Sequence, residues 1–151
     1  MKIRNTWKDL PEPLESHEDI RGTITDIFYN ESINHVAVVE SSPNVLRGNH
    51  YHKKSIQHML MLEGSLEYWY KELDSPDPAK MVLAKKGDLV STPPNEIHAL
   101  VITPEGNKFM VFGEGPRGGC DYEADTYRVS NIVPEDKLKG VTNVTYIQPL
   151  T

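Results

Sequence analysis

The sequence predicts an all-β fold, either a sandwich or a barrel, because short apolar runs alternate with turn residues along most of the chain. The runs are rich in β-branched and aromatic residues, which strands favour. Between them stand Gly, Pro, Asn, Asp and Ser, which favour turns. The spacing of the runs is regular, and only one late segment has the signals of a helix.

The first half of the chain shows these signals clearly. His-Val-Ala-Val-Val-Glu at 35–40 is rich in β-branched residues, and Ser-Ser-Pro-Asn at 41–44 breaks the strand. Residues 56–62 form an apolar run short enough for a buried strand, which Glu63-Gly64 is expected to stop. Residues 66–71 then alternate between two faces with the period of a strand.

The second half continues the pattern. After a loop with two prolines at 73–79, we expect short strands at 81–84, 89–92, 99–103 and 109–112. The predicted turns between them are 86–88, 93–95 and 104–107. A glycine-rich loop at 113–119 follows, and Pro134 and Gly140 predict the start and stop of one short helix. We expect one domain over 1–151, with a core of about 19–113 and a C-terminal extension of 114–151.

Composition excludes several classes of protein. The net charge is −6, and the basic residues are scattered, so no nucleic-acid partner is expected. A single cysteine, Cys120, excludes an internal disulfide framework and fits a reducing compartment. The start does not resemble a signal peptide, and no run of 18 apolar residues occurs. We therefore expect a cytoplasmic protein with no membrane partner.

Three histidines form the candidate site. His50 and His52 flank Tyr51, so on a strand they project to the same face. His98, from a distant strand, could meet them inside a barrel. Neutral imidazole is a common ligand of transition metals. The alternative is that each histidine is an ordinary core residue, since a His-x-His pair alone is weak evidence.

The spacing around these histidines resembles the two sequence motifs of the cupin family. The first motif is matched by Asn44, His50, His52, Gln57 and Gly64, and the second by Gly87, Pro93, Asn95, His98 and Ile102. Asn44 and Asn95 replace glycines, and Asn tolerates left-handed backbone better than other non-glycine residues. The resemblance implies a double-stranded β-helix, or jelly-roll barrel, followed by a short C-terminal helix or arm.

The resemblance also implies a metal site made by His50, His52, Gln57 and His98, for zinc, iron, nickel or manganese, and no organic cofactor. Gln57 stands where the family has a metal-binding carboxylate. An amide oxygen offers a dipole instead of a charge, so we expect weaker metal binding or an open coordination position. The same change also suits a metal-free site, in which Gln57 donates a hydrogen bond to a substrate carbonyl.

A narrower resemblance concerns sugar-modifying enzymes. Val45-Leu-Arg-Gly-Asn-His-Tyr51 and Asp19-Ile-Arg-Gly22 are similar to segments of dTDP-sugar 3,5-epimerases and 3,4-ketoisomerases. The resemblance implies that His50 removes a proton beside a ketone and that Arg21 and Arg47 bind the nucleotide-sugar. His52 is the other candidate base. Gln57 and Tyr68 are further candidates for substrate binding, Tyr68 by strand position.

These observations favour an isomerase or epimerase acting on a keto-deoxysugar nucleotide by histidine-mediated proton transfer, with or without a divalent metal. Two alternatives stay open: a metal-dependent oxygenase or lyase with a three-histidine centre, and a non-catalytic protein that binds a sugar or small acid. We also expect a homodimer, because Tyr51 and Trp69 would face outward and add aromatic area to the surface.

Overall fold

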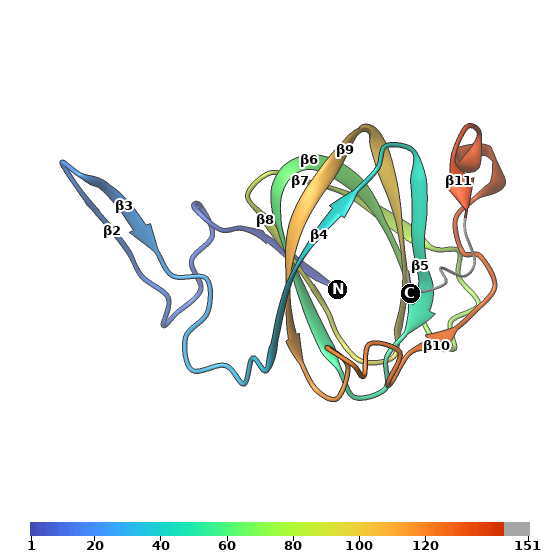
Figure 1. Cartoon of the computed structure of the whole chain (residues 1–151), viewed down its shortest axis with the longest axis horizontal. Coiled ribbons are helices and arrows are strands. Elements are labelled where there is room, and N and C mark those ends of the chain that lie inside the picture. The colour runs from blue at the N-terminus through green and yellow to red at the C-terminus, as the bar shows by residue number, and fades with distance from the viewer. Residues whose placement is uncertain (144–151) are drawn as a thin grey trace.

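The computed structural model describes residues 1–143, and strands dominate it (Figure 1). The last eight residues are not described, so the end of the predicted extension lies outside this range. The strands are β1 (Lys2–Asn5), β2 (Ser16–Asp19), β3 (Gly22–Thr25), β4 (His35–Ser41), β5 (Val45–Tyr51), β6 (Ile56–Glu72), β7 (Lys80–Lys85), β8 (Asp88–Thr92), β9 (Glu96–Glu114), β10 (Tyr127–Arg128) and β11 (Thr142–Asn143).

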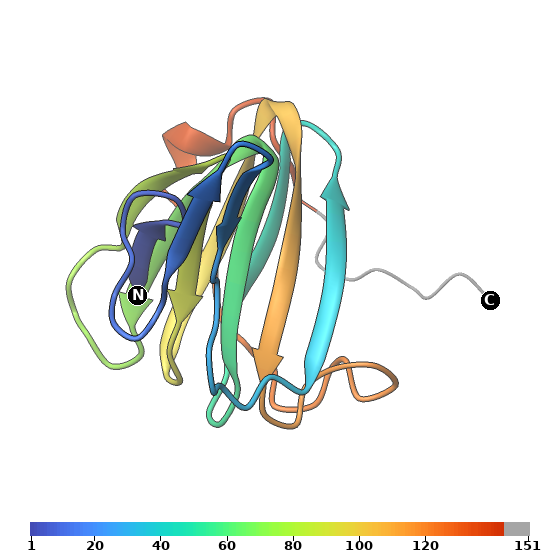
Figure 2. The same cartoon turned by 90° about the vertical axis from the view of Figure 1, so that its left-hand side faces the viewer.

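The strands form two packed layers that share β6 and β9, the two longest strands (Figure 2). The first part of β6 pairs with β8, and the last part of β9 pairs with β4. The other halves of these two strands pair with β7 and β5. This arrangement is the predicted jelly-roll barrel, and it brings β5 and β9 together at the histidines.

Two predicted turns are wrong, because β6 and β9 each run through the segment where the sequence suggests a stop. The register of β6 shifts around Glu63 and Gly64, where the strand bends without ending. Gly64 and Gly106 meet at this bend, and a Cβ on Gly64 would lie only 2.0 Å from the Gly106 carbonyl oxygen. Both glycines have positive φ angles. Glycine here lets two strands bend together and pass from one layer to the other.

The asparagines that replace motif glycines behave as expected. Asn44 and Asn95 have φ angles of 55° and 63°, in the left-handed region. Each lies in a turn between strands, and the Asn95 amide donates to the His52 carbonyl at 2.7 Å. The two asparagines therefore keep the left-handed backbone conformation that glycine would have at these motif positions.

The interior of the barrel is apolar away from the histidines. Alternate residues of β6, β8 and β9, with Ala84 of β7, point inward and pack as one buried cluster, made up of Met59, Met61, Leu66, Tyr68, Ala84, Val90, Leu100, Ile102, Phe109 and Val111. His58 has the opposite parity and lies outside, where it hydrogen-bonds Ser91 and Glu114. The strand period thus separates His58 from the candidate site.

The C-terminal extension covers the outer face of the β5 layer. Trp69 packs there against Leu46 and Val133, and it is only 7% exposed. Tyr51 stacks on Tyr127, which β10 brings alongside β5, with the ring centroids 5.3 Å apart. These two aromatic residues do face outward, but the chain covers Trp69 itself, so Trp69 cannot supply the predicted dimer contact.

The extension also contains the short helix that the sequence predicts. It is a 3-10 helix, Glu135–Leu138, with Pro134 at its N-cap and Gly140 after its end. Among residues 1–143 no helix has the length and apolar character needed to cross a membrane.

The N-terminal part contains strands that the sequence analysis did not predict. β1 pairs with β8 at the sheet edge, whereas β2 and β3 form a hairpin that projects from the barrel (Figure 1).

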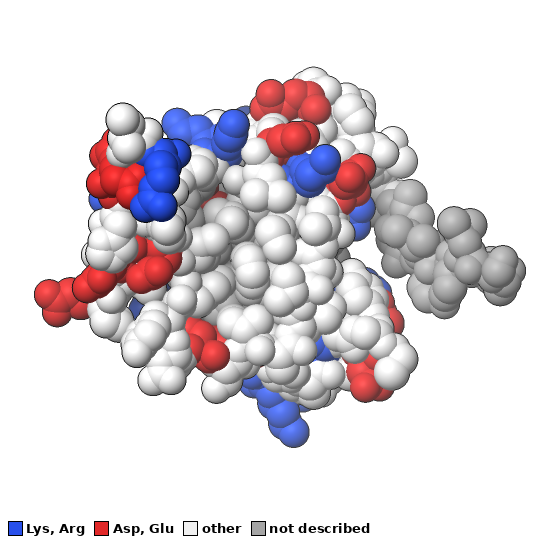
Figure 3. Space-filling view, turned by 60° about the vertical axis from the view of Figure 1, so that its left-hand side comes forward, with Lys and Arg blue, Asp and Glu red and all other residues white. Residues whose placement is uncertain are grey.

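Figure 3 shows a largely uncharged area on the side of the barrel near this hairpin. Val36 and Val38 on β4 are exposed, as are Ile20 and Ile24 of the hairpin. A homodimer stays a prediction.

Candidate functional site

A β-bulge in β5 directs His50 into the barrel. Arg47 pairs with Leu100 and His50 pairs with His98, and these two partners on β9 are two residues apart and face the same side. On β5 the two positions are three residues apart, because Asn49 is an extra residue in the strand. Without the bulge, the strand period would turn His50 outward. Gly48 permits the bulge, because a Cβ there would lie 2.7 Å from the His98 carbonyl oxygen. The Arg-Gly-Asn-His sequence is therefore the local cause of the orientation of His50.

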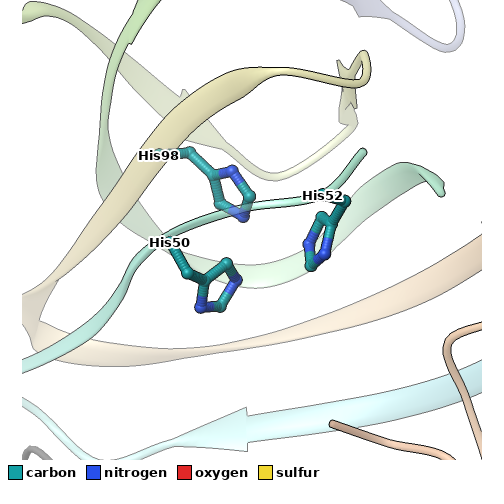
Figure 4. A group of neighbouring side chains, drawn as sticks. All are labelled: His50, His52 and His98. Atoms are coloured by element: carbon teal, nitrogen blue, oxygen red, sulfur yellow. The ribbon is translucent and has the colours of Figure 1, made fainter. Parts of the chain in front are cut away.

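His50, His52 and His98 converge in the barrel interior, as the sequence predicts (Figure 4). One ring nitrogen from each residue can be chosen so that all three lie within 4.8 Å of one another. The ring centroids of His50 and His98 are 4.7 Å apart. His52 and His98 are buried, whereas His50 is only partly buried. His50 is thus the member of the cluster that solvent reaches most readily.

Backbone carbonyls orient two of the three rings. His52 Nδ1 lies 2.8 Å from the Asp125 carbonyl oxygen, and His98 Nδ1 lies 3.2 Å from that of Glu96. A carbonyl can only accept, so each Nδ1 carries the proton and each Nε2 keeps its lone pair. His52 Nε2 and His50 Nδ1 are buried, and no described residue hydrogen-bonds either atom.

The electrostatic environment keeps the cluster neutral. Burial lowers the pKa of His98 to about 3, with a further contribution from His52. Burial also lowers the pKa of His50 far below its ordinary value, and His98 and His52 lower it further. The pKa of His52 is lowered by burial, although its hydrogen bond to Asp125 acts in the opposite direction. At neutral pH all three imidazoles can therefore act as metal ligands or as proton acceptors.

Gln57 and Tyr68 both lie beside the cluster. Gln57 is near enough to His52 to raise its pKa by hydrogen bonding, although no hydrogen bond with full geometry reaches His52 Nε2. Tyr68 stacks on His98 and is fully buried. Its hydroxyl contacts Thr92 at 2.6 Å and Glu96 at 3.1 Å. Tyr68 therefore supports His98 from behind, and its contact with a substrate stays a prediction.

The two arginines that the sequence suggests for substrate binding lie apart from the histidines. Arg21 is on the projecting hairpin, where its side chain is 85% exposed and its guanidinium pairs with Asp19. Arg47 Nε donates to the Ser41 hydroxyl at 3.0 Å, beside the turn between β4 and β5. Within this chain, neither guanidinium joins the cluster.

The C-terminal extension contributes residues that the sequence analysis missed. Besides orienting His52, Asp125 accepts hydrogen bonds through its carboxylate from the backbone amides of 53–55. Arg128 pairs with His50 in the strand register, and Arg117 donates to Thr126, the residue after Asp125. The charges of both arginines lower the pKa of His50. No motif marks these residues, because they follow the last cupin motif. The only available signal is a group of charged residues after a glycine-rich loop.

Comparison with known proteins identifies the family. Residues 17–113 match the family described as the polysaccharide biosynthesis C-terminal domain. No curated protein matches the chain.

Several solved structures share the fold. A dTDP-4-dehydrorhamnose 3,5-epimerase from Sulfolobus tokodaii has a TM-score of 0.65 at 16% identity, with 86% of this chain and 81% of that chain covered. QdtA, a sugar 3,4-ketoisomerase from Thermoanaerobacterium thermosaccharolyticum in complex with TDP, has a TM-score of 0.61 at 22% identity, with 77% and 84% covered.

The capsular polysaccharide assembling protein CapF from Staphylococcus aureus also shares this fold. Its TM-score is 0.58 at 20% identity, and 79% of this chain matches 35% of CapF. These identities are low, so the three structures establish the fold and the matched family establishes membership. The chain has the RmlC-like jelly-roll fold and belongs to the polysaccharide biosynthesis C-terminal domain family.

Proposed function

We propose that this protein is an isomerase or epimerase that moves a proton beside the ketone of a nucleotide-linked keto-deoxysugar. The observation that carries the proposal is the cluster of three neutral histidines, of which His50 is the most accessible and has an unpartnered, buried Nδ1. A base of this kind, close to other polar groups, suits proton abstraction from carbon. The sugar-modifying activities named for proteins of the same fold support this choice of substrate class.

His50 is the base in this proposal. The Nδ1 atoms of His52 and His98 are held by backbone carbonyls, whereas His50 has no such constraint among the described residues. Its lowered pKa keeps it in the form that accepts a proton. A substrate with a diphosphate would bring negative charge into the site, which would raise the basicity of His50 during the reaction.

The proposed reaction conserves atoms and electrons. His50 accepts the proton from the carbon next to the ketone, and the electron pair of that C–H bond moves to form an enolate. A proton delivered from water to the opposite face of the same carbon inverts the centre, and His50 then releases its proton to solvent. Alternatively, after proton transfer between the oxygens, His50 returns its proton to the former carbonyl carbon and the ketone moves. The Gln57 side-chain amide would donate to the developing oxyanion, whereas the unprotonated Nε2 atoms of His52 and His98 could act on it only through a bound cation.

Deuterium exchange tests this proposal. Incubation of the protein with a dTDP-4-keto-6-deoxysugar in deuterated water should place deuterium on the carbon next to the ketone, because His50 returns a solvent-derived deuteron. NMR or mass spectrometry of the sugar would measure the incorporation. If no keto-sugar nucleotide shows exchange above a protein-free control, the proposed activity is wrong.

We also propose that His52, His98 and Gln57, with or without His50, hold a divalent transition metal. The donor set fits such an ion, because carbonyl-bound Nδ1 atoms leave the Nε2 lone pairs facing the cluster, as in many histidine metal sites. When bound, a metal would supply a positive charge that stabilises the enolate oxygen. A nitrogen of His50 that binds the metal cannot also accept the substrate proton, so the two roles of that nitrogen exclude each other.

Gln57→Glu tests the metal proposal. The added carboxylate should tighten binding of Zn²⁺ by about tenfold or more, because it partly neutralises the ion in a site with little water. Calorimetric titration of Zn²⁺ into chelator-treated wild-type and variant proteins would measure the difference. Glu67→Gln, which changes a residue of β6 on the outer face, is the control. Equal affinities in Gln57→Glu and wild type would mean that Gln57 is not a ligand.

A second candidate function follows from the same cluster. If all three histidines bind one ion, the site matches a three-histidine centre of an oxygenase or lyase. Oxygen consumption with a small organic acid, lost on chelation, together with no deuterium exchange, would favour this alternative.

A further inference from the structure

The segment between β9 and β10 crosses the end of the barrel at which β5 ends (Figures 1 and 2). Asp125 attaches this segment to the site through His52 and the amides of 53–55. β10 continues it along β5, where Arg128 pairs with His50 in the strand register. The segment therefore lies at the end of the barrel where the partly exposed His50 is found.

Arg117 in this segment is held in a defined orientation. Its Nε donates to the Thr126 hydroxyl at 3.2 Å, and its guanidinium lies over the Tyr122 ring at 4.3 Å from the centroid. Thr126 directly follows Asp125. The same short segment thus positions both a histidine of the cluster and a guanidinium beside that cluster.

The charge of Arg117 is not neutralised by either contact. Thr126 and Tyr122 are uncharged, and no ion pair of Arg117 is found within residues 1–143. Arg128 differs, because Glu123 accepts from it through both carboxylate oxygens. Among the described residues, Arg117 hydrogen-bonds through Nε alone, so its two terminal amino groups are available to an anion. A fork of this kind matches the oxygens of a phosphate.

A guanidinium beside a cluster of neutral histidines makes this end of the barrel electropositive. Arg117 lowers the pKa of His50, His52 and His98, which agrees with its position near all three. The chain as a whole carries a net charge of −6. A local positive charge next to the proposed reaction centre attracts an anionic ligand.

We propose that Arg117 is a phosphate-binding residue and that the C-terminal segment holds the diphosphate of the substrate at the mouth of the barrel. Arg117 lies outside residues 17–113, the part of the chain that matches the family. This role rests on the proposed function, which supplies a nucleotide-linked sugar as substrate. With the diphosphate on Arg117, the sugar would extend toward His50.

Binding of dTDP, UDP and inorganic pyrophosphate to the metal-free protein tests this inference. Calorimetry at low ionic strength should show that Arg117→Ala raises the Kd of the tightest of the three by about tenfold or more. Arg117→Gln removes the charge but keeps a polar side chain of similar reach, and should have nearly the same effect. Arg117→Lys should retain part of the affinity. Lys137→Ala removes one exposed positive charge from the same extension and should change the Kd less than twofold.

The outcomes separate this inference from the proposed function. Unchanged Kd values in folded Arg117→Gln, or no saturable binding of any of the three anions by the wild-type protein, would overturn the role of Arg117. If the wild type binds a diphosphate through Arg117 but catalyses no exchange, the inference holds and the proposed activity fails. If the wild type catalyses exchange but the Arg117 variants bind the diphosphate as tightly as the wild type, the proposed activity holds and the role of Arg117 is wrong.

Discussion

His50→Asn should lower the rate of deuterium exchange by at least about 100-fold, because it removes the proposed base. Asn is polar and can occupy the same position, but it does not accept a proton near neutral pH. His50 has an unpartnered Nδ1 in the present structure, so no described hydrogen bond is lost in the variant. The loss should therefore fall on the chemical step more than on folding.

His58→Asn is the matched control, because it makes the same substitution on the outer face of the barrel. His58 contacts Ser91 and Glu114 and takes no part in the cluster. This variant should exchange at the wild-type rate, even if its thermal midpoint falls. Equal exchange in His50→Asn and wild type would exclude His50 as the base and leave His52 as the candidate.

The free energy of unfolding of the metal-free protein should fall steeply as the pH is lowered from 6.5. The ordinary pKa of histidine is 6.5, and burial lowers that of His98 to about 3. Between these values the unfolded chain binds a proton at His98 that the folded chain does not bind. The free energy of unfolding therefore falls as the pH falls, by up to about 1.4 kcal/mol per unit for such a histidine.

His50 acts in the same direction, since its pKa is also lowered by burial. From pH 6.5 to pH 4.5 the two residues together should cost roughly 4 kcal/mol of stability. Urea unfolding of chelator-treated protein across this range would measure the loss. His98→Gln should remove about half of the pH dependence, whereas His17→Gln, on the exposed hairpin, should leave it unchanged. The same pH dependence in His98→Gln and wild type would show that His98 is not buried neutral.

The sequence predicts a site residue well when nearby residues in the chain determine its position, and less well when a distant segment does. His-x-His on one strand places two imidazoles on the same face through the strand period alone, so His50 and His52 could be paired from the sequence. His98 and Gln57 required the motif spacing of the family, because strand pairing brings them close. Arg21 and Arg47 were assigned from short segments, and in this chain their guanidiniums lie by Asp19 and Ser41.

The fold shows the same limit in the segments around Gly64 and Gly106. Both segments have the composition of turns, but in a barrel a glycine can also let a long strand bend into the second layer. Likewise, Trp69 faces outward as the strand period requires, and the C-terminal extension then covers it. Local patterns predict the face of a residue, whereas the covering of that face depends on a segment far along the chain.

The sequence by itself determined the all-β class, most of the barrel strands and the convergence of three histidines, because these follow from strand period and motif spacing. Only the tertiary structure decided that Asp125 orients His52 and that the segment holding Asp125 also places Arg117 beside the cluster. The physical reason is that hydrogen bonds and charge contacts between distant segments depend on packing, and no local pattern encodes them.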